Sequence, residues 1–145
     1  MQVIRRGAGG RPVEARSGPF TGQAWGDHLM SRDDVSMSTV YFSPGARTFW
    51  HRHERGQLLT ATSGEGVVVS RDGTVIRLRA GEMAWTTPDE EHWHGACDDT
   101  FLVHTSTTIG STTWLEEVAS DDYLRASHPD PDDVSAADST TETQA

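Results

Sequence analysis

Short stretches with a period of two, each ending in turn residues, run through the middle of this 145-residue chain. The clearest, 35–43, is rich in β-branched and aromatic residues and stops at a Pro-Gly pair. Two more, 66–71 and 74–79, flank an Asp-Gly dipeptide that tolerates the positive φ angles of a type I′ hairpin turn. Further strands are predicted at 57–62, 83–87 and 101–107. Strands this short and closely spaced predict an all-β sandwich or barrel.

The length of the chain allows one domain, because two compact cores need more residues than this. Residues 126–145 carry five acidic side chains, no basic one and almost no large apolar one, so a disordered acidic tail is expected there. Residues 1–17 are rich in glycine and arginine and are expected to form a flexible arm. A single domain is therefore predicted at 18–125, and within it only 114–125 looks helical.

The charged residues exclude several kinds of partner and chemistry. The chain has 22 acidic and 12 basic side chains, a net charge of -10, and every basic residue is an arginine. Without lysine there is no Schiff-base chemistry and no P-loop. Without a basic run the chain lacks the surface that binds nucleic acid or an anionic membrane. The expected partner is therefore a small-molecule substrate or another protein.

The single cysteine, Cys97, cannot form a disulfide within the chain, which fits a reducing compartment. Asp98 and Asp99 follow it and should raise the pKa of its thiol, so a nucleophilic role is not expected. The N-terminal residues include two adjacent arginines but no apolar run behind them, and the chain has no apolar stretch of membrane-spanning length. These features predict a cytoplasmic protein.

Five of the seven histidines lie in the strand-rich region: His51, His53, His92, His94 and His104. Four of them form two His-x-His pairs, and residues i and i+2 of an extended segment point the same way. Each pair can therefore aim both imidazoles at one point inside a barrel. A single pair is more often a surface or core feature, but two pairs favour a site for a divalent transition metal.

Glycines and a glutamine flank the first histidine pair, so that the sequence of residues 45–64 follows the pattern G-x5-H-x-H-x3-Q-x6-G. The second pair closes a segment, 81–95, that begins with glycine and has a proline before the histidines. These segments resemble the two motifs of the cupin superfamily, with Gln57 where glutamate usually stands. The strings at 51–59 and 87–96 are similar to those of small single-domain cupins of the carboxymuconolactone decarboxylase-associated type, which include cupin hydroxynitrile lyases.

The resemblance implies a double-stranded β-helix, or jelly-roll barrel, with a short C-terminal helix, and a homodimer that pairs barrels edge to edge. The family's metal ligands fall on His51, His53, Gln57 and His92. The resemblance favours Mn²⁺ or Fe²⁺, while the ligand types also admit Zn²⁺, Co²⁺ or Ni²⁺. Three neutral imidazoles and a neutral amide leave the metal charge uncompensated, which makes a stronger Lewis acid.

The second motif departs from the family pattern at three positions. Asp89 replaces the glycine of the turn before the third histidine, and aspartate is one of the few residues that accept a left-handed conformation there. Thr87 and Glu91 replace the usual proline and lysine. These two departures bear on the substrate more than on the metal.

His94 and His104 lie outside the family's ligand pattern and are candidate catalytic acid-base groups. The alternative is that they are hydrogen-bonded core histidines. The resemblance also places Leu102, His104 and Ser106 on the inward face of their strand. A substrate pocket is predicted from the apolar residues of the neighbouring strands, which suit a small aromatic or aliphatic compound better than a sugar: Val40, Phe42 and Leu59.

Three functions remain open at this point. The first is a metal-dependent enzyme of lyase, isomerase or cyclase type, which uses Lewis-acid and histidine acid-base chemistry on a small organic substrate. The second is an Fe(II)-dependent cupin dioxygenase, because a three-histidine site with open positions can hold O₂ and substrate together. The third is a non-enzymatic metal-containing domain that binds or senses a small molecule. The additional histidines, His94 and His104, favour an enzyme over this third function.

Overall fold

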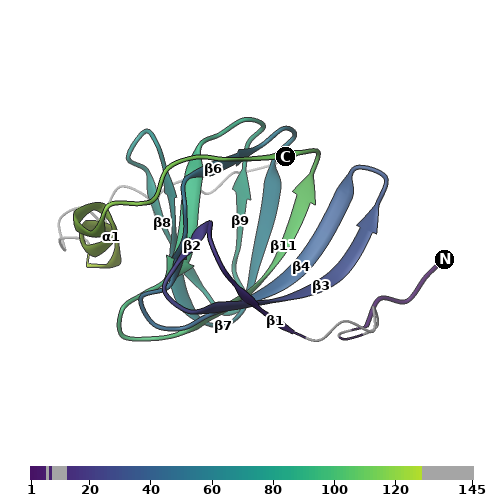
Figure 1. Ribbon diagram of the computed structural model, residues 1–145, viewed down its shortest axis with the longest axis horizontal. Helices are drawn as coiled ribbons and strands as arrows, with labels where there is room; N and C mark the ends of the chain where they lie inside the picture. The colour runs from purple at the N-terminus through teal and green to yellow at the C-terminus, as the bar shows by residue number, and fades with distance from the viewer. Residues whose placement is uncertain (6, 8–12, 129–145) are drawn as a thin grey trace, which may run out of the picture.

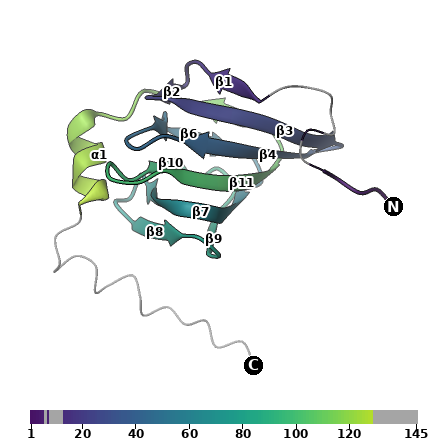
Figure 2. The ribbon, with the colours of Figure 1, turned by 90° about the horizontal axis from the view of Figure 1, so that it is seen from below.

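The computed structural model describes residues 1–5, 7 and 13–128, which form a curled antiparallel sheet and one short helix (Figures 1 and 2). The all-β prediction is confirmed. The strands are β1 (Glu14–Arg16), β2 (Phe20–Thr21), β3 (Ala24–Arg32), β4 (Val35–Phe42), β5 (Arg47–Thr48), β6 (His51–His53), β7 (Gln57–Ser70), β8 (Val75–Arg79), β9 (Met83–Thr86), β10 (His92–Ala96), β11 (Leu102–Ile109) and β12 (Thr112–Trp114), and the helix is α1 (Ser120–Ser127). None of the helical structure in the described residues has the length and hydropathy needed to cross a lipid bilayer.

The strand order β1-β3-β4-β11-β7-β10-β5-β2 wraps segments that are distant in the sequence around one interior. In addition, β6 pairs with both β10 and β12, whereas β8 and β9 pair with β7. The first part of β7 lies beside β11 and β9, and its last part lies beside β10 and β8. This one strand therefore belongs to both sides of the barrel.

Alternate residues of β4, β7 and β11 face the interior, as a period of two requires. Leu102 lies opposite Phe42, and His104 lies opposite Val40. The three predicted pocket residues, Val40, Phe42 and Leu59, all belong to the buried cluster that fills this interior. Leu102 and His104 are also buried, so their predicted inward orientation is confirmed.

A second apolar cluster fixes α1 against the outside of β10. Trp93, which is fully buried, packs on Tyr123 with ring centroids 5.9 Å apart. The Tyr123 hydroxyl donates a hydrogen bond of 2.8 Å to the backbone oxygen of Ala96. The Arg47 guanidinium lies 4.3 Å from the centre of the same ring, a cation-π contact. The helix therefore clamps the strand that carries the second histidine pair.

The helix begins six residues later than the predicted range, 114–125, and this prediction needs correction. The segment before it continues the sheet instead, because β12 pairs with β6. The backbone N–H of Leu115 then donates to the Trp50 oxygen at 2.8 Å, and that of Trp50 donates to the Glu116 oxygen at 3.0 Å. These backbone bonds to an open strand edge outweigh the helical pattern of the isolated segment.

The described ends of the chain extend the ordered structure past the expected boundaries. Residues 14–16 of the expected arm form β1, which pairs with β3. The helix continues to Ser127, two residues past 125, and Ala126 and Ser127 are buried. Residues 6 and 8–12 of the expected arm and 129–145 of the expected tail lie outside the described residues.

Two turn details also differ from the expectation. The strands predicted at 57–62 and 66–71 are one continuous strand, β7, which bends where its register with β11 shifts between Val103 and His104. A bulge of this kind inserts one unpaired residue and increases the local bend. The connection to β8 is not a type I′ turn, because only Gly73 of the Asp-Gly pair has a positive φ, 94°. Here the backbone N–H of Ser70 donates to the Thr74 oxygen, which closes a longer loop.

Candidate metal centre

Two neighbouring strands carry the histidine pairs into the barrel. β6 and β10 are antiparallel with His51 directly opposite His92, so both pairs lie on the inner face. His51, His53 and His92 are each at most 3% exposed. One ring nitrogen of each lies within 4.8 Å of the others, close enough to share one ion. The i and i+2 spacing thus brings these three predicted ligands together.

Backbone carbonyls set the tautomers of two of these rings. Nδ1 of His51 is 2.9 Å from the Phe49 oxygen, and Nδ1 of His92 is 2.9 Å from the Glu90 oxygen. A carbonyl oxygen only accepts, so each Nδ1 carries the proton and each Nε2 presents a lone pair. Outer hydrogen bonds of this kind orient histidine ligands in metal sites.

The third ring has a hydroxyl partner, which can either donate or accept. Nδ1 of His53 is 2.9 Å from the Thr112 hydroxyl. Its Nε2 is buried and has no hydrogen-bond partner in the described part of the chain. A buried nitrogen without a partner is costly unless something binds it. This orphaned atom lies within the three-histidine cluster.

Gln57 completes the cluster at the start of β7. Its amide nitrogen donates to the Thr108 hydroxyl at 2.9 Å, which leaves its oxygen 3.3 Å from Nε2 of His92. Both of these facing atoms present lone pairs, so they repel unless a positive charge lies between them. Three imidazole nitrogens and one amide oxygen fit a divalent transition metal.

Burial keeps the cluster in its ligand-competent form. It lowers the pKa of His51 well below its usual value, and that of His53 to about 4. The pKa of His92 is also lowered, again chiefly by burial. Neighbouring imidazoles lower the pKa values of His51 and His53 further, because protonating one ring disfavours charge on the next. Neutral imidazole is the form that binds a metal.

His94 and His104, the predicted acid-base pair, form a buried dyad beside this cluster. Nε2 of His104 is 3.0 Å from Nδ1 of His94. The His94 ring centre lies 5.2 Å from that of His51. Burial lowers the pKa of His104 to about 4, and lowers that of His94 well below its usual value. Nδ1 of His104 is buried and has no partner among the described residues.

An aromatic wall lines one side of the histidines. Among the predicted pocket residues, Phe42 contacts the dyad: its ring centre lies 5.2 Å from that of His104 and 5.9 Å from that of His94. The sequence reasoning missed two further rings. Trp114 lies 4.6 Å from His51, and Phe20 lies 6.0 Å from both Phe42 and Trp114. Trp114 was expected on a helix, and only a period-two reading of the residues after Gly110 would have found it.

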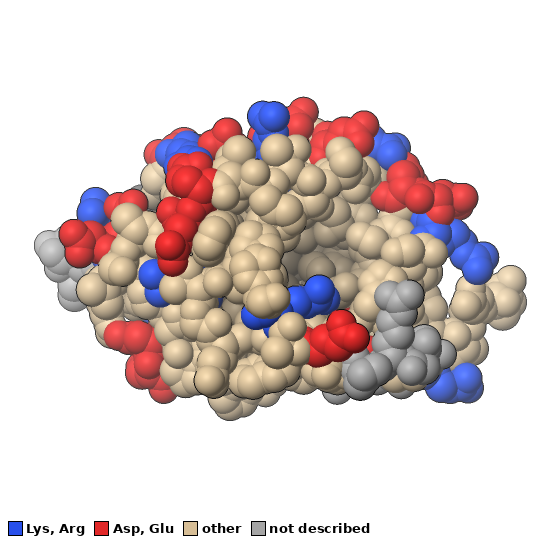
Figure 3. Space-filling view, viewed as in Figure 1, with Lys and Arg blue, Asp and Glu red and all other residues tan. Residues whose placement is uncertain are grey.

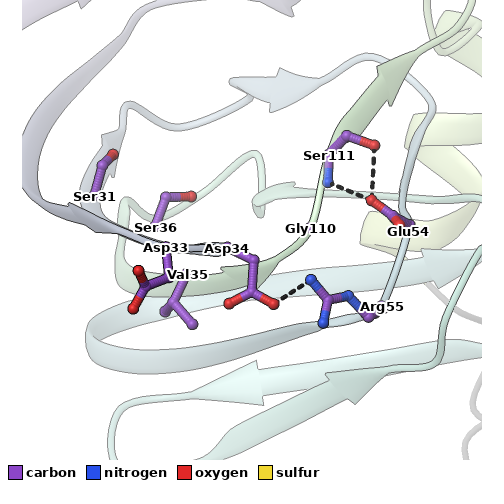
Figure 4. A pocket seen from close by; sticks show the side chains of 9 residues that line it. All are labelled: Ser31, Asp33, Asp34, Val35, Ser36, Glu54, Arg55, Gly110 and Ser111. Atoms are coloured by element: carbon purple, nitrogen blue, oxygen red, sulfur yellow. Dashed lines mark hydrogen bonds and ion pairs between the residues drawn. The ribbon is translucent and has the colours of Figure 1, made fainter.

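Polar contacts fix the loop that follows His53 (Figure 4). The Glu54 carboxylate accepts hydrogen bonds from the backbone N–H and the hydroxyl of Ser111, at 3.1 and 3.2 Å. These bonds lower the pKa of Glu54. Arg55 forms an ion pair with Asp34. Asp34, Glu54, Arg55 and Ser111 line an open cavity of about 330 Å³. None of the clustered histidines lines it, so this cavity is separate from the candidate metal centre.

The turn before the third histidine has the backbone conformation expected for it. Asp89 has a φ of 59°, in the left-handed region, as predicted. Its backbone N–H donates to the oxygen of His53 at 2.8 Å. This bond ties the turn before His92 to the strand that carries the first histidine pair.

A small antiparallel barrel with an inward cluster of three histidines and an amide defines a class of single-domain barrels whose interior is compatible with a divalent metal. Residues 38–105 match the model of the Cupin domain family. The chain is also 36% identical over 113 residues to an (R)-mandelonitrile lyase from Granulicella tundricola. The aligned region covers 73% of this chain and 86% of that protein. The chain belongs to the cupin family, as the sequence motifs predicted.

Solved structures agree with this assignment. A cupin-like protein from Thermotoga maritima superposes with a TM-score of 0.77 and 31% identity, over 90% of this chain and 100% of that one. A polyketide cyclase from Streptomyces resistomycificus superposes with a TM-score of 0.64 over 89% and 94% of the two chains. Its identity is 17%, so it shows the shared fold alone.

Proposed function

We propose that this cupin is a metal-dependent enzyme that acts on a small organic substrate by Lewis-acid and histidine acid-base chemistry, without oxidation. The observation that carries the proposal is the pair of facing lone pairs on Gln57 and His92, next to the orphaned Nε2 of His53. With the ring nitrogen of His51 these atoms make four acceptors around one point, and a water molecule could donate hydrogen bonds to only two of them. The arrangement becomes favourable when a cation joins the donors.

The protein's own donors would set the strength of that cation. His51, His53, His92 and Gln57 would hold Mn²⁺ or Fe²⁺, which supplies a Lewis acid that polarises a substrate oxygen. None of these four side chains is negatively charged in its ligand form. Their neutrality preserves the charge of the ion, so the donor set favours polarisation chemistry.

The dyad would move the proton. When Nε2 of His94 takes a proton from a substrate hydroxyl, Nδ1 can pass its own proton to Nε2 of His104 across 3.0 Å. The reverse transfer returns a proton to the product. The position of His94 beside the cluster, rather than within it, supports this role.

The reaction type we favour is that of a lyase. The relative from Granulicella tundricola is named an (R)-mandelonitrile lyase. Cleaving a cyanohydrin needs a base for its hydroxyl and a positive charge that stabilises the developing oxyanion. The aromatic wall of Phe20, Phe42 and Trp114 would pack against an aryl group of such a substrate.

Metal analysis of the purified protein, paired with assays of mandelonitrile cleavage, tests this proposal. We expect about one Mn²⁺ or Fe²⁺ per chain and hydrogen cyanide release that disappears in His51→Ala. His28→Ala, which changes a half-buried histidine outside the cluster, is the matched control. Oxygen consumption with small aromatic substrates would instead favour the dioxygenase, and metal without turnover on any of them would favour a binding or sensor domain.

A further inference from the structure

Arg16 is an exposed residue at the edge of the sheet, and its side chain starts from the inner face of the barrel. β1 is the first strand of the sheet, and Arg16 is paired with Ala24 of β3. Directly opposed residues of an antiparallel pair share a face. Ala24 is 2% exposed and belongs to the interior cluster that contains Phe42. The side chain of Arg16 therefore starts from the inner face of the sheet.

A glycine makes room for the Arg16 guanidinium. A Cβ placed at Gly26 would overlap Nε, Nη2 and Cζ of Arg16, so these atoms lie directly against the backbone of β3. Gly26 is opposite Val40, and Val40 is opposite His104. These residues form one interior row. With strands about 4.8 Å apart, the row is about 10 Å long from β3 to β11.

The described residues supply no counter-ion for the Arg16 guanidinium. Within residues 1–5, 7 and 13–128, no carboxylate forms an ion pair with Arg16 and no hydrogen bond holds it. Glu14 shares this face of β1 and is paired with Gly26, but its carboxylate forms no ion pair with Arg16. By contrast, acidic side chains pair with several other arginines: Arg55, Arg71, Arg77 and Arg125. The space-filling view shows a hollow with arginine atoms along its lower edge and acidic atoms beside them (Figure 3).

We propose that Arg16 binds a carboxylate of the substrate at the mouth of the barrel. This inference rests on the proposed function and names its substrate class: a small organic acid whose apolar body separates the carboxylate from the reacting group. The planar guanidinium can donate two parallel hydrogen bonds to a carboxylate. Phe20 and Phe42 would contact the apolar body, and the reacting group would lie at His94 and the metal ligands.

Three hydroxamates, titrated into the metal-loaded protein by calorimetry, separate the two ends of the site. Benzohydroxamate carries only the metal-chelating group, and its 4-carboxy and 4-carbamoyl derivatives add an anionic or a neutral group of similar shape. We expect the wild-type protein to bind the carboxy compound roughly ten-fold more tightly than the carbamoyl compound, the scale of a charge-assisted bidentate pair that is partly exposed.

Two variants remove the arginine contact in different ways. Arg16→Gln removes the charge, and Gly26→Ala pushes the guanidinium away without changing the charge. Arg125→Gln is the control, because it removes one positive charge from a side chain on α1 that is 75% exposed. The preference should fall to about one-fold in the first two variants and persist in the third. Unchanged affinity for benzohydroxamate shows that each variant is folded and loaded.

The outcomes distinguish a failure of this inference from a failure of the proposed enzyme function on which it rests. If benzohydroxamate does not bind the wild-type protein, the proposed metal enzyme fails and the inference fails with it. If benzohydroxamate binds but the wild-type protein does not prefer the carboxy compound, only the inference is wrong. An equal loss of preference in Arg16→Gln and Arg125→Gln would also overturn it, because general charge would then explain the effect.

Discussion

At Gln57 an amide stands where a carboxylate of the same shape would add a negative charge to the cluster. Gln57→Glu should retain the metal but lower the turnover of mandelonitrile, because the added charge partly neutralises the cation. Metal content and kcat, measured on the same samples, check this. Gln23→Glu, a change at an exposed position, is the matched control. An unchanged kcat would show that the amide does not tune the metal.

The roles of His94 and His104 can be separated from those of the ligands. Changing either to alanine should leave about one metal ion per chain and lower turnover ~100-fold, the scale of a lost general base. Metal analysis and kcat measurements distinguish the alternatives. Loss of the metal together with activity would make the residue a ligand. Retention of both would make it a core histidine.

Residues whose role depends on local spacing could be predicted from the sequence. The two His-x-His pairs and the left-handed Asp89 are of this kind, because neighbouring backbone geometry fixes them. Phe20 and Trp114 were missed, because they reach the site only through the pairing of β2 with β5 and of β12 with β6. The pKa of Cys97 is raised as expected, but burial contributes more than the adjacent aspartates.

At the scale of elements, β7 depends on glycine at its bend. Gly64 has a φ of 75°, and a Cβ there would collide with the backbone of Phe101. Gly64→Ala should therefore lower the free energy of unfolding by at least ~2 kcal/mol. Gly73→Ala is the matched comparison, since its φ of 94° is also positive but its surroundings are open. It should cost about 1 kcal/mol, from the backbone conformation alone.

Urea unfolding of both variants measures the difference. Equal losses would mean that β7 relaxes around the added methyl group and that the bend is not fixed by its contact with Phe101.

The helix shows where pattern alone is insufficient. Residues 114–125 have helical periodicity, but the first part of this range lies along β6 and the residues before it. It forms backbone hydrogen bonds there with groups at the edge of the barrel. Secondary-structure propensity is local, whereas strand pairing depends on which edge is free in the folded molecule. Strand regions and the fold class were therefore predictable, and the ends of the helix were not.

For the whole molecule, five buried histidines predict acid sensitivity of the metal-free protein. Burial holds their folded pKa values below the usual 6.5, and those of His53 and His104 at about 4. The unfolded chain thus binds more protons between these limits, so the free energy of unfolding should fall as the pH is lowered from about 6.5 toward 4. The lowered carboxyl pKa values of Glu54 and Glu116 act in the same direction, because their stabilising contribution is lost as the pH falls through their ordinary value of 4.5 and below.

Urea unfolding at several pH values checks this prediction. A His104→Gln variant should show a shallower decline, because it removes one titrating group. A free energy of unfolding that stays constant or rises on acidification would contradict it.

The homodimer stays a prediction of the family resemblance, and light scattering of the concentrated protein would check it.

The contact between Trp114 and His51 also provides a spectroscopic probe of the site. An indole whose ring centre lies 4.6 Å from that of His51, a proposed ligand, is close enough for a bound paramagnetic ion to quench its fluorescence. Trp25, Trp50, Trp85 and Trp93 would emit as well, so the difference between the wild-type protein and Trp114→Phe isolates the signal. Loading of the barrel could then be followed in real time, with no dye attached to a chain that offers neither a lysine nor an exposed cysteine for labelling.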